Sequence, residues 1–246
     1  MPNLSGKIAL VTGASRGIGA AIAERLAREG AHVVITYSAS KEKADAMVAA
    51  LQKEGVKAAA LLADANQPAT MPELVERVVK EWGGIDILVN NAGVWSMGNI
   101  GEVPMEEYER VRRVNVDSVF ALTNAAVRHM KPGSRIINIS SGLGERASGP
   151  MMSTYTASKF AVTGFTRGWA KDLGAKGILV NAVLPGPIDT DMNPASGPFA
   201  EFQKAQTALG RYGHAEEIAG AVAFLAGPDA SYITGAHLNV DGGWNA

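Results

Sequence analysis

The stretch KIALVTGASRGIG, residues 7–19, decides the fold of this 246-residue chain. Its short apolar run is typical of a buried parallel strand. Gly13, Gly17 and Gly19 then allow a tight turn, and apolar residues at helical spacing over 20–28 predict a helix directly after it. In an ordinary strand-to-helix turn, these glycines would serve only to adopt positive φ values. The strand before them and the helix after them favour a dinucleotide-binding site instead. In such a site the pyrophosphate lies at the N-terminal end of the helix.

The rest of the chain alternates short apolar strands with amphipathic helices. This alternation predicts one α/β domain over residues 1–246, with a doubly wound, seven-stranded parallel sheet and helices on both faces. The predicted strands are 8–12, 32–36, 57–63, 85–90, 134–140, 178–184 and 237–240. The predicted helices after the first include 41–53, 71–82, 105–130, 154–172 and 215–226.

Composition limits the classes of function. The chain is 47% hydrophobic and 19% charged, which is typical of a globular protein. A net charge of −1 leaves no basic surplus, so we expect neither nucleic acid nor a membrane surface as a partner. The absence of cysteine excludes disulfides and thiolate chemistry. His32, His129, His214 and His237 show no ligand spacing, so no metal site is predicted. No signal segment or bilayer-spanning stretch is present, and we expect a cytoplasmic protein.

A second motif places a phenol and an amine on one helix face. Tyr155 and Lys159 are four residues apart in the predicted helix 154–172, so their side chains project together. A phenol with a pKa of about 10 is a poor acid–base catalyst at neutral pH. A neighbouring ammonium would lower that pKa. Such a pair alone is more often part of a solvated surface, but the Ser140-Ser141 pair upstream and the glycine turn favour a catalytic site.

Together these motifs resemble the short-chain dehydrogenase/reductase family in its classical form. The resemblance rests on TGxxxGIG at 12–19, NNAG at 90–93 and YxxxK at 155–159, and it covers essentially the whole chain. Further matching positions are Asp64, Asn115, Ser141, Pro185-Gly186, Thr190 and the ending 239–243. The resemblance implies a single Rossmann domain, similar to β-ketoacyl-ACP reductase-like carbonyl reductases. It also implies a homotetramer built through the predicted helices 105–130 and 154–172 and the C-terminal strand.

The resemblance implies four catalytic residues, Asn115, Ser141, Tyr155 and Lys159. Ser141 would donate a hydrogen bond to the substrate oxygen, and Tyr155 would exchange a proton with it. Lys159 would lower the pKa of the phenol and bind the nicotinamide ribose. Asn115 matches the position that anchors a water in the proton relay. Ser140 competes with Ser141, but the family places the catalytic serine second in the pair.

The resemblance also implies a set of cofactor-binding positions. They are Gly13, Ser15, Arg16, Gly17, Ile18, Gly19, Tyr37, Ser38, Asp64, Ala65, Asn91, Ala92, Gly93, Tyr155, Lys159, Pro185, Gly186, Ile188 and Thr190. A carboxylate after the second strand would bind the ribose 2′-hydroxyl and repel a 2′-phosphate, but none occurs before Glu42. Arg16, with Ser38 and Lys41, favours a phosphate instead, unless Arg16 is only a solvated turn residue. We therefore expect NADP(H) rather than NAD(H).

The least regular stretch is 186–213, which is rich in proline and glycine. Because it follows the sixth predicted strand, we expect it to cover a substrate at the carboxyl edge of the sheet. The candidate walls of that pocket are apolar: Trp95, Met97, Leu143, Met151, Met152, Met192, Phe199 and Phe202. Such walls predict a bulky apolar or aromatic ketone, or the matching secondary alcohol, as substrate.

Two alternatives stay open. The first is a 3-oxoacyl-[acyl-carrier-protein] reductase. Such family members hold the carrier with two basic residues near the entrance, and these positions fall at Pro132 and Lys176 here. Only one is basic, so a free ketone or alcohol is favoured. The second alternative is a non-catalytic NADP-sensing regulatory protein, which would usually lack the catalytic serine, tyrosine or lysine.

Overall fold

Seven parallel strands form the centre of the computed structural model, which describes residues 3–246. Their order in the sheet is β3-β2-β1-β4-β5-β6-β7. The strands are β1 (Ile8–Val11), β2 (His32–Tyr37), β3 (Ala58–Leu62), β4 (Ile87–Asn90), β5 (Arg135–Ile139), β6 (Leu179–Pro185) and β7 (His237–Val240). The predicted fold class, a doubly wound parallel sheet of seven strands, is confirmed.

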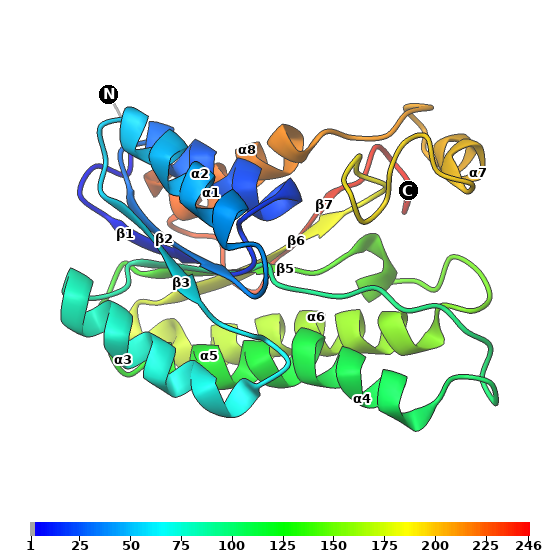
Figure 1. The fold of residues 1–246 in the computed structure, drawn as a ribbon, viewed down its shortest axis with the longest axis horizontal. Helices are drawn as coiled ribbons and strands as arrows, with labels where there is room; N and C mark the ends of the chain where they lie inside the picture. The colour runs from blue at the N-terminus through cyan, green and yellow to red at the C-terminus, as the bar shows by residue number, and fades with distance from the viewer. Residues whose placement is uncertain (1–2) are drawn as a thin grey trace.

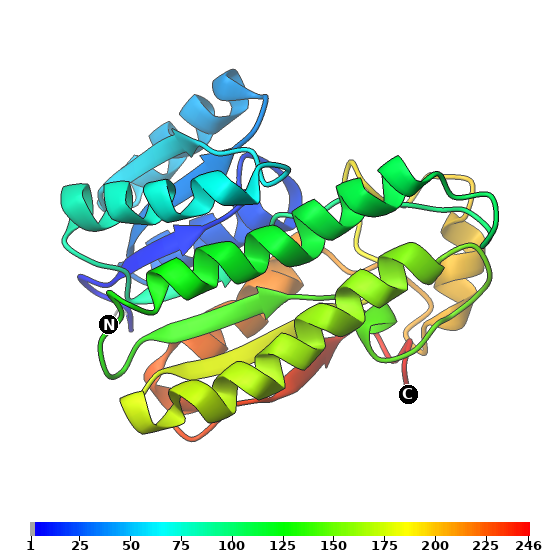
Figure 2. The same ribbon diagram turned by 90° about the horizontal axis from the view of Figure 1, so that it is seen from below.

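Helices cover both faces of this sheet (Figure 1). One face carries α1 (Gly17–Arg28), α2 (Lys41–Lys53) and α8 (Ala215–Ala226). The other carries α3 (Met71–Trp82), α4 (Met105–Arg112), α5 (Ser118–Ala126) and α6 (Ser153–Leu173). Figure 2 shows α3, α5 and α6 side by side across this second face. In the part of the chain that is described, none of the helices is long and apolar enough to cross a bilayer.

Alternate residues of each strand build two separate cores. In β1, Ala9 and Val11 pack with α1 and α8, whereas Leu10 packs with α3, α5 and α6. All three side chains are fully buried. Burial on both faces explains why the strands are continuous apolar runs in the sequence rather than alternating ones. Each buried side chain of leucine size stabilises the fold by about 1.5–3 kcal/mol.

The predicted helix over 105–130 is interrupted in the structure. After α4, residues Arg113–Asp117 form a π-helical segment, and α5 then ends at Ala126. Residues 127–129 form turns rather than helix. The wider π turn is centred on Asn115, whose side chain bonds to segments outside the helix. Hydrophobic periodicity does not distinguish a π segment from regular helix, so the sequence could not show the interruption.

The irregular stretch 186–213 contains a short helix that the sequence did not reveal, α7 (Ala200–Gln206). The two ends of the stretch meet at a neck. There the Gly213 amide donates to the Pro187 carbonyl at 2.9 Å, and the Asp189 amide donates to the Gly213 carbonyl at 3.0 Å. Figure 1 shows α7 close to the C-terminus, at the end of the molecule toward which β6 points. We call residues 186–213 the lid.

Candidate active site

A cavity of about 910 Å³ opens at the carboxyl edge of the sheet. It is lined by the glycine turn before α1, the ends of β4, β5 and β6, the start of α6 and the lid. Every predicted cofactor position and every predicted wall residue lines it. Of the predicted catalytic residues, Ser141, Tyr155 and Lys159 line it, whereas Asn115 does not. Residues that are far apart in the sequence therefore surround one continuous space.

The glycine turn leaves the first turn of α1 open to an anion. Gly13 and Gly17 have φ values of +63° and +58°, which other residues rarely adopt. At Gly19 a Cβ atom would lie 2.5 Å from Asn91 Nδ2, so a larger residue does not fit. No side chain caps the N-terminus of α1. Its free amides, beside the cavity, fit the pyrophosphate of a dinucleotide.

Two asparagines, the last residue of β4 and the residue after it, hold this edge of the sheet together. The Asn91 side-chain amide donates to the Thr12 carbonyl at 2.8 Å, and its backbone amide donates to Thr12 Oγ1 at 2.9 Å. The Asn90 amide donates to Thr123 Oγ1 at 3.0 Å and to Asn138 Oδ1 at 2.8 Å. Asn91 therefore fixes the glycine turn, while Asn90 fixes β4 to α5 and β5 inside the core.

Lys159 is buried beside Tyr155. Its ammonium donates to the Ile139 carbonyl at 3.0 Å, and Nζ lies 5.6 Å from the centre of the Tyr155 ring. Burial lowers the pKa of Lys159 to about 8. An ammonium group with a pKa this close to neutral pH can lose its proton under mildly alkaline conditions. Such shifted pKa values are common at catalytic sites.

The expected lowering of the Tyr155 pKa by Lys159 is not found. Burial raises the pKa of Tyr155 to about 12, and the Ser141 hydroxyl, hydrogen-bonded to the phenol, acts in the opposite direction. Trp95 covers the phenol ring with a centroid separation of 4.5 Å. Because Lys159 is itself desolvated and bonded to a backbone carbonyl, desolvation of the phenol dominates. Tyr155 consequently keeps its proton at neutral pH.

Asn115 lies behind the cavity wall, with 1% of its surface exposed. Its Oδ1 accepts from the Val94 amide at 2.8 Å, and its Nδ2 donates to the Val94 carbonyl at 2.9 Å and to Ser158 Oγ at 3.0 Å. These three bonds tie the segment after β4 to α6. The side chain thus supports the wall, and its Nδ2 donates to two protein atoms.

Arg16 is engaged in an ion pair that the sequence did not predict. Its guanidinium lies 3.1 Å from the Asp191 carboxylate of the lid, and Lys43 Nζ lies 3.8 Å from the same oxygen. Lys41, expected to help bind a phosphate, instead pairs with Asp45 at 2.6 Å and does not line the cavity. The second cation beside Arg16 is therefore Lys43.

The apolar part of the cavity lies under the lid. The Phe199 and Phe202 side chains are 53% and 59% exposed, although both line the cavity. Met151 is the one non-glycine residue with positive φ in the described part of the chain, at +65°. Its carbonyl accepts from the Gly98 amide at 2.8 Å and joins two walls. A bulky residue in this backbone region is strained, and such strain is concentrated at functional sites.

Sequence reasoning missed several polar residues on the lid side of the cavity. Tyr212 Oη donates to Gln203 Oε1 at 3.1 Å, and Asn193 Nδ2 donates to the same oxygen at 2.9 Å. Trp244 Nε1 donates to Gln206 Oε1 at 2.9 Å and joins α7 to the end of the chain. No motif marks these residues. They could have been found only by treating every polar residue of the irregular stretch as a candidate.

The positions expected to hold an acyl carrier lie far from the cavity. Pro132 and Lys176 precede β5 and β6 at the amino edge of the sheet, where Pro132 packs against Gly177. The cavity is at the carboxyl edge of the same strands. The expectation that these residues lie near the entrance is therefore wrong for the cavity of their own chain.

Comparisons with known proteins agree with this geometry. A family model described as "Enoyl-(Acyl carrier protein) reductase" matches residues 13–245. A short chain dehydrogenase from Burkholderia cenocepacia J2315, solved in complex with NADP, is 47% identical, with a TM-score of 0.97 over 99% of this chain and 100% of that chain. Versicolorin reductase 1 of Aspergillus parasiticus is 40% identical over 98% of this chain and 97% of its own. The cyclic-di-GMP-binding biofilm dispersal mediator protein of Escherichia coli is 41% identical over the full length of both chains.

Proposed function

The chain belongs to the short-chain dehydrogenase/reductase family, and we propose that it is an NADP(H)-dependent carbonyl reductase or alcohol dehydrogenase acting on bulky apolar or aromatic ketones. One observation supports this most strongly. Ser141, Tyr155 and Lys159 share a cavity wall with Trp95, beneath a lid that contributes Phe202. Hydrogen-bonding groups for a carbonyl oxygen therefore adjoin an apolar space large enough for a bulky substrate.

The proposed chemistry divides between cofactor and protein. When bound, the nicotinamide cofactor supplies or accepts the hydride. The Ser141 hydroxyl donates a hydrogen bond to the carbonyl oxygen, where negative charge grows during reduction. Tyr155 donates its proton to that oxygen, since burial raises the pKa of Tyr155 to about 12 and keeps the phenol protonated. The Lys159 ammonium then stabilises the phenolate that remains.

The preference for NADP(H) is supported by the charges around the glycine turn. Arg16 and Lys43 both lie beside the Asp191 carboxylate, so two cations already hold one anionic group there. Tyr37 and Ser38, at the end of β2, line the cavity without an acidic neighbour before Glu42. A ribose 2′-phosphate has the charge and the acceptor oxygens to replace Asp191. The Burkholderia cenocepacia relative was solved with NADP.

A reductase activity is also consistent with the versicolorin reductase relative. The alternative of a 3-oxoacyl-[acyl-carrier-protein] reductase needs room for a carrier-linked chain, and the lid covers the apolar part of the cavity with Phe199 and Phe202. The alternative of a regulatory protein is suggested by the Escherichia coli relative. We favour an enzyme because the serine, tyrosine and lysine are all retained.

The proposal includes a cytoplasmic homotetramer. Phe120 on α5 stays 49% exposed, and Phe160 on α6 stays 46% exposed. Phe165 stacks on Trp169 at 4.7 Å, and Phe120 lies 6.0 Å from Phe165. An aromatic face of this kind on paired helices favours burial against a second copy of the chain.

Initial rates of NADPH oxidation with a panel of carbonyl compounds test the proposal. The panel contains aryl ketones, small aliphatic ketones and an acetoacetyl thioester on an acyl carrier, with Tyr155→Phe protein as the blank. We expect kcat/KM to be at least about tenfold higher for aryl than for small ketones. A carrier thioester that outperforms every free ketone would support the first alternative. NADPH binding without turnover of any compound would support the second.

A further inference from the structure

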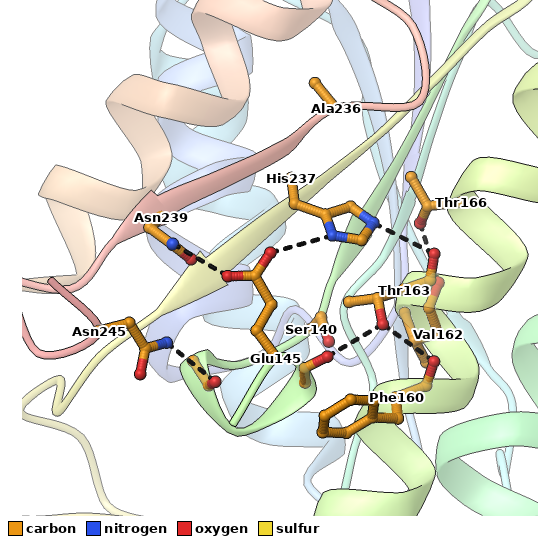
Figure 3. Close-up of polar contacts among 12 residues, drawn as sticks. Ser140, Glu145, Phe160, Val162, Thr163, Thr166, Ala236, His237, Asn239 and Asn245 are labelled. Atoms are coloured by element: carbon orange, nitrogen blue, oxygen red, sulfur yellow. Dashed lines mark hydrogen bonds and ion pairs between the residues drawn. The ribbon is translucent and has the colours of Figure 1, made fainter. Parts of the chain in front are cut away.

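The turn that follows Ser141 ends at a histidine–glutamate pair that the proposed chemistry does not use. The short 3-10 turn η3 (Gly142–Gly144) connects Ser141 to Glu145. Glu145 Oε1 lies 3.1 Å from Nδ1 of His237 on β7, and Glu145 Oε2 accepts a hydrogen bond from Asn239 Nδ2 at 3.1 Å. Figure 3 shows the carboxylate between these two side chains of one strand. Two positions of β7 therefore hold the end of the serine turn.

His237 also contacts the helix that carries Tyr155 and Lys159. Its Nε2 lies 3.2 Å from the Thr163 carbonyl of α6, and its side chain is only 5% exposed. The Thr163 hydroxyl donates in turn to the Gly144 carbonyl at 3.0 Å (Figure 3). His237 thus joins the serine turn, through Glu145, to the same helix that presents the phenol and the ammonium.

Both ring nitrogens of His237 face hydrogen-bond acceptors. The Thr163 carbonyl only accepts, and an ionised Glu145 carboxylate only accepts, whereas a neutral imidazole has one N–H group. Both contacts are hydrogen bonds only when the pair holds one additional proton, either on the imidazole or on the carboxyl group. Without that proton, the imidazole can donate to Glu145 or to the Thr163 carbonyl but not to both, so the link from the serine turn through His237 to α6 loses one of its two contacts.

The other charged groups around the pair have partners of their own. Arg146, next to Glu145, donates to a backbone carbonyl near the C-terminus at 2.7 Å. Asp241, directly after β7, accepts from two backbone amides at 2.9 and 3.0 Å. On β6 the residue paired with His237 is Ala182, and α6 presents the Thr163 carbonyl. Among the described residues, Glu145 is the acidic side chain within ion-pair distance of His237.

We propose that His237 and Glu145 are positioning residues that hold the turn after Ser141 against α6, the helix that carries Tyr155, and that this link, with both contacts of His237, is complete only while the pair retains its proton. The inference rests on the proposed function, because the position of Ser141 matters for a carbonyl substrate. A displaced Ser141 hydroxyl loses its contact with the reacting oxygen but leaves the glycine turn and the cofactor positions unchanged. The pair should therefore affect kcat far more than KM for NADPH.

Two substitutions of Glu145 distinguish the effect of the proton from the effect of the link itself. In Glu145→Gln, the amide N–H can donate to a neutral His237 while its oxygen still accepts from Asn239, so the link no longer needs the proton. In Glu145→Ala the link is absent at every pH. We expect the kcat of the wild type to fall relative to Glu145→Gln as the pH rises. Glu145→Ala should lose about tenfold in kcat at all pH values, with KM for NADPH within about twofold of the wild type.

A second histidine–glutamate pair in the same chain is a matched control. His129 Nε2 lies 2.8 Å from Glu76 Oε1, between the segment after α5 and α3, and neither residue lines the cavity. Glu76→Gln makes the same chemical change there. It should leave both kcat and its pH profile as in the wild type.

Thermal unfolding of the same proteins, without substrate, gives a readout that does not depend on turnover. The unfolding midpoint of the wild type should decrease relative to that of Glu145→Gln as the pH rises, because only the wild type loses a contact of the link. Parallel pH profiles of all proteins in both assays would overturn the inference. A pH-dependent difference in unfolding without one in kcat would make the pair merely structural, which also overturns it. Absence of ketone turnover in the wild type would contradict the proposed function instead, and the unfolding data would still test the link.

Discussion

At Tyr155 burial and a hydrogen bond shift the pKa of the phenol in opposite directions. Burial raises the pKa of Tyr155 to about 12, while the hydrogen bond from Ser141 favours the ionised form. Burial dominates, so the phenol keeps its proton at neutral pH, which suits the proposed role of a proton donor in ketone reduction. The four-residue spacing to Lys159 correctly predicted a shared wall. It could not predict the pKa, because the coverage by Trp95 and the bond from Lys159 to a β5 carbonyl depend on tertiary contacts.

The charge of Lys159 gives a pH dependence of cofactor binding. Burial lowers its pKa to about 8, so the ammonium is present below that pH and is lost as the pH rises through it. Because the cofactor is anionic, the Kd for NADPH, measured by fluorescence titration, should increase about fivefold on the alkaline side. Lys171→Ala, a lysine on the same helix that does not line the cavity, should keep the wild-type profile. A Kd that stays constant across this range would mean that the Lys159 ammonium does not contribute to binding.

Arg16 gives a test of cofactor preference at a single side chain. Arg16→Ala should raise the Kd for NADPH by about tenfold or more and the Kd for NADH by less than about twofold, since only NADPH carries the 2′-phosphate. Lys41→Ala is the matched control, because Lys41 pairs with Asp45 outside the cavity. A wild-type protein that binds NADH more tightly than NADPH would contradict the assignment of Arg16 and Ser38.

At the scale of elements, the lid combines a closed neck with an apolar inner face. The pairing of Gly213 with Pro187 and Asp189 holds its ends together, and Gln203 and Tyr212 are bonded within it. Its proline and glycine content correctly predicted a segment outside the sheet. The neck and α7 were not predictable, because they depend on contacts between residues more than twenty positions apart and on a helix too short for a periodic signal.

A substitution of Phe202 tests whether the lid covers the substrate. Removing its ring in Phe202→Ala should raise KM for aryl ketones about tenfold, because burying an aromatic ring is worth about 1.5–3 kcal/mol, and should leave small ketones nearly unaffected. Phe224→Ala, which removes an exposed ring from α8 outside the cavity, is the control.

Limited proteolysis is an independent check on the same element. We expect cleavage within 186–213 to slow when NADP and an aryl ketone are both present. Equal cleavage with and without ligands, together with equal losses for small and large ketones in Phe202→Ala, would show that the lid does not contact the substrate.

At the scale of the whole molecule, the alternation of apolar runs and helices was enough to predict a seven-stranded parallel sheet. The reason is that strands such as β1 are buried on both faces and leave an unambiguous pattern. The grouping of the expected cofactor positions around one cavity was predictable from family motifs that lie at the ends of these strands. The pairs Arg16–Asp191 and His237–Glu145 were not predictable, because they join residues 175 and 92 positions apart and no motif contains both partners.

A substitution on the aromatic face of α5 and α6 tests the proposed tetramer. Phe120→Glu places a charge on this face, and we expect it to reduce the mass measured by light scattering from that of a tetramer to that of a smaller species. Leu62→Glu, at an exposed position on β3 at the opposite edge of the sheet from β7, should remain a tetramer. A wild-type monomer, or a Phe120→Glu protein of unchanged mass, would contradict the proposed interface.

The most direct test of the central claim is the steady-state rate of NADPH-dependent ketone reduction by Tyr155→Phe, measured together with its Kd for NADPH. The substitution removes one hydroxyl and keeps the ring that packs against Trp95. We predict a fall in kcat of at least about a hundredfold with a Kd for NADPH within about twofold of the wild type, because only the proton donor is lost. A kcat within a few-fold of the wild type would contradict the assignment of Tyr155 as the acid–base group.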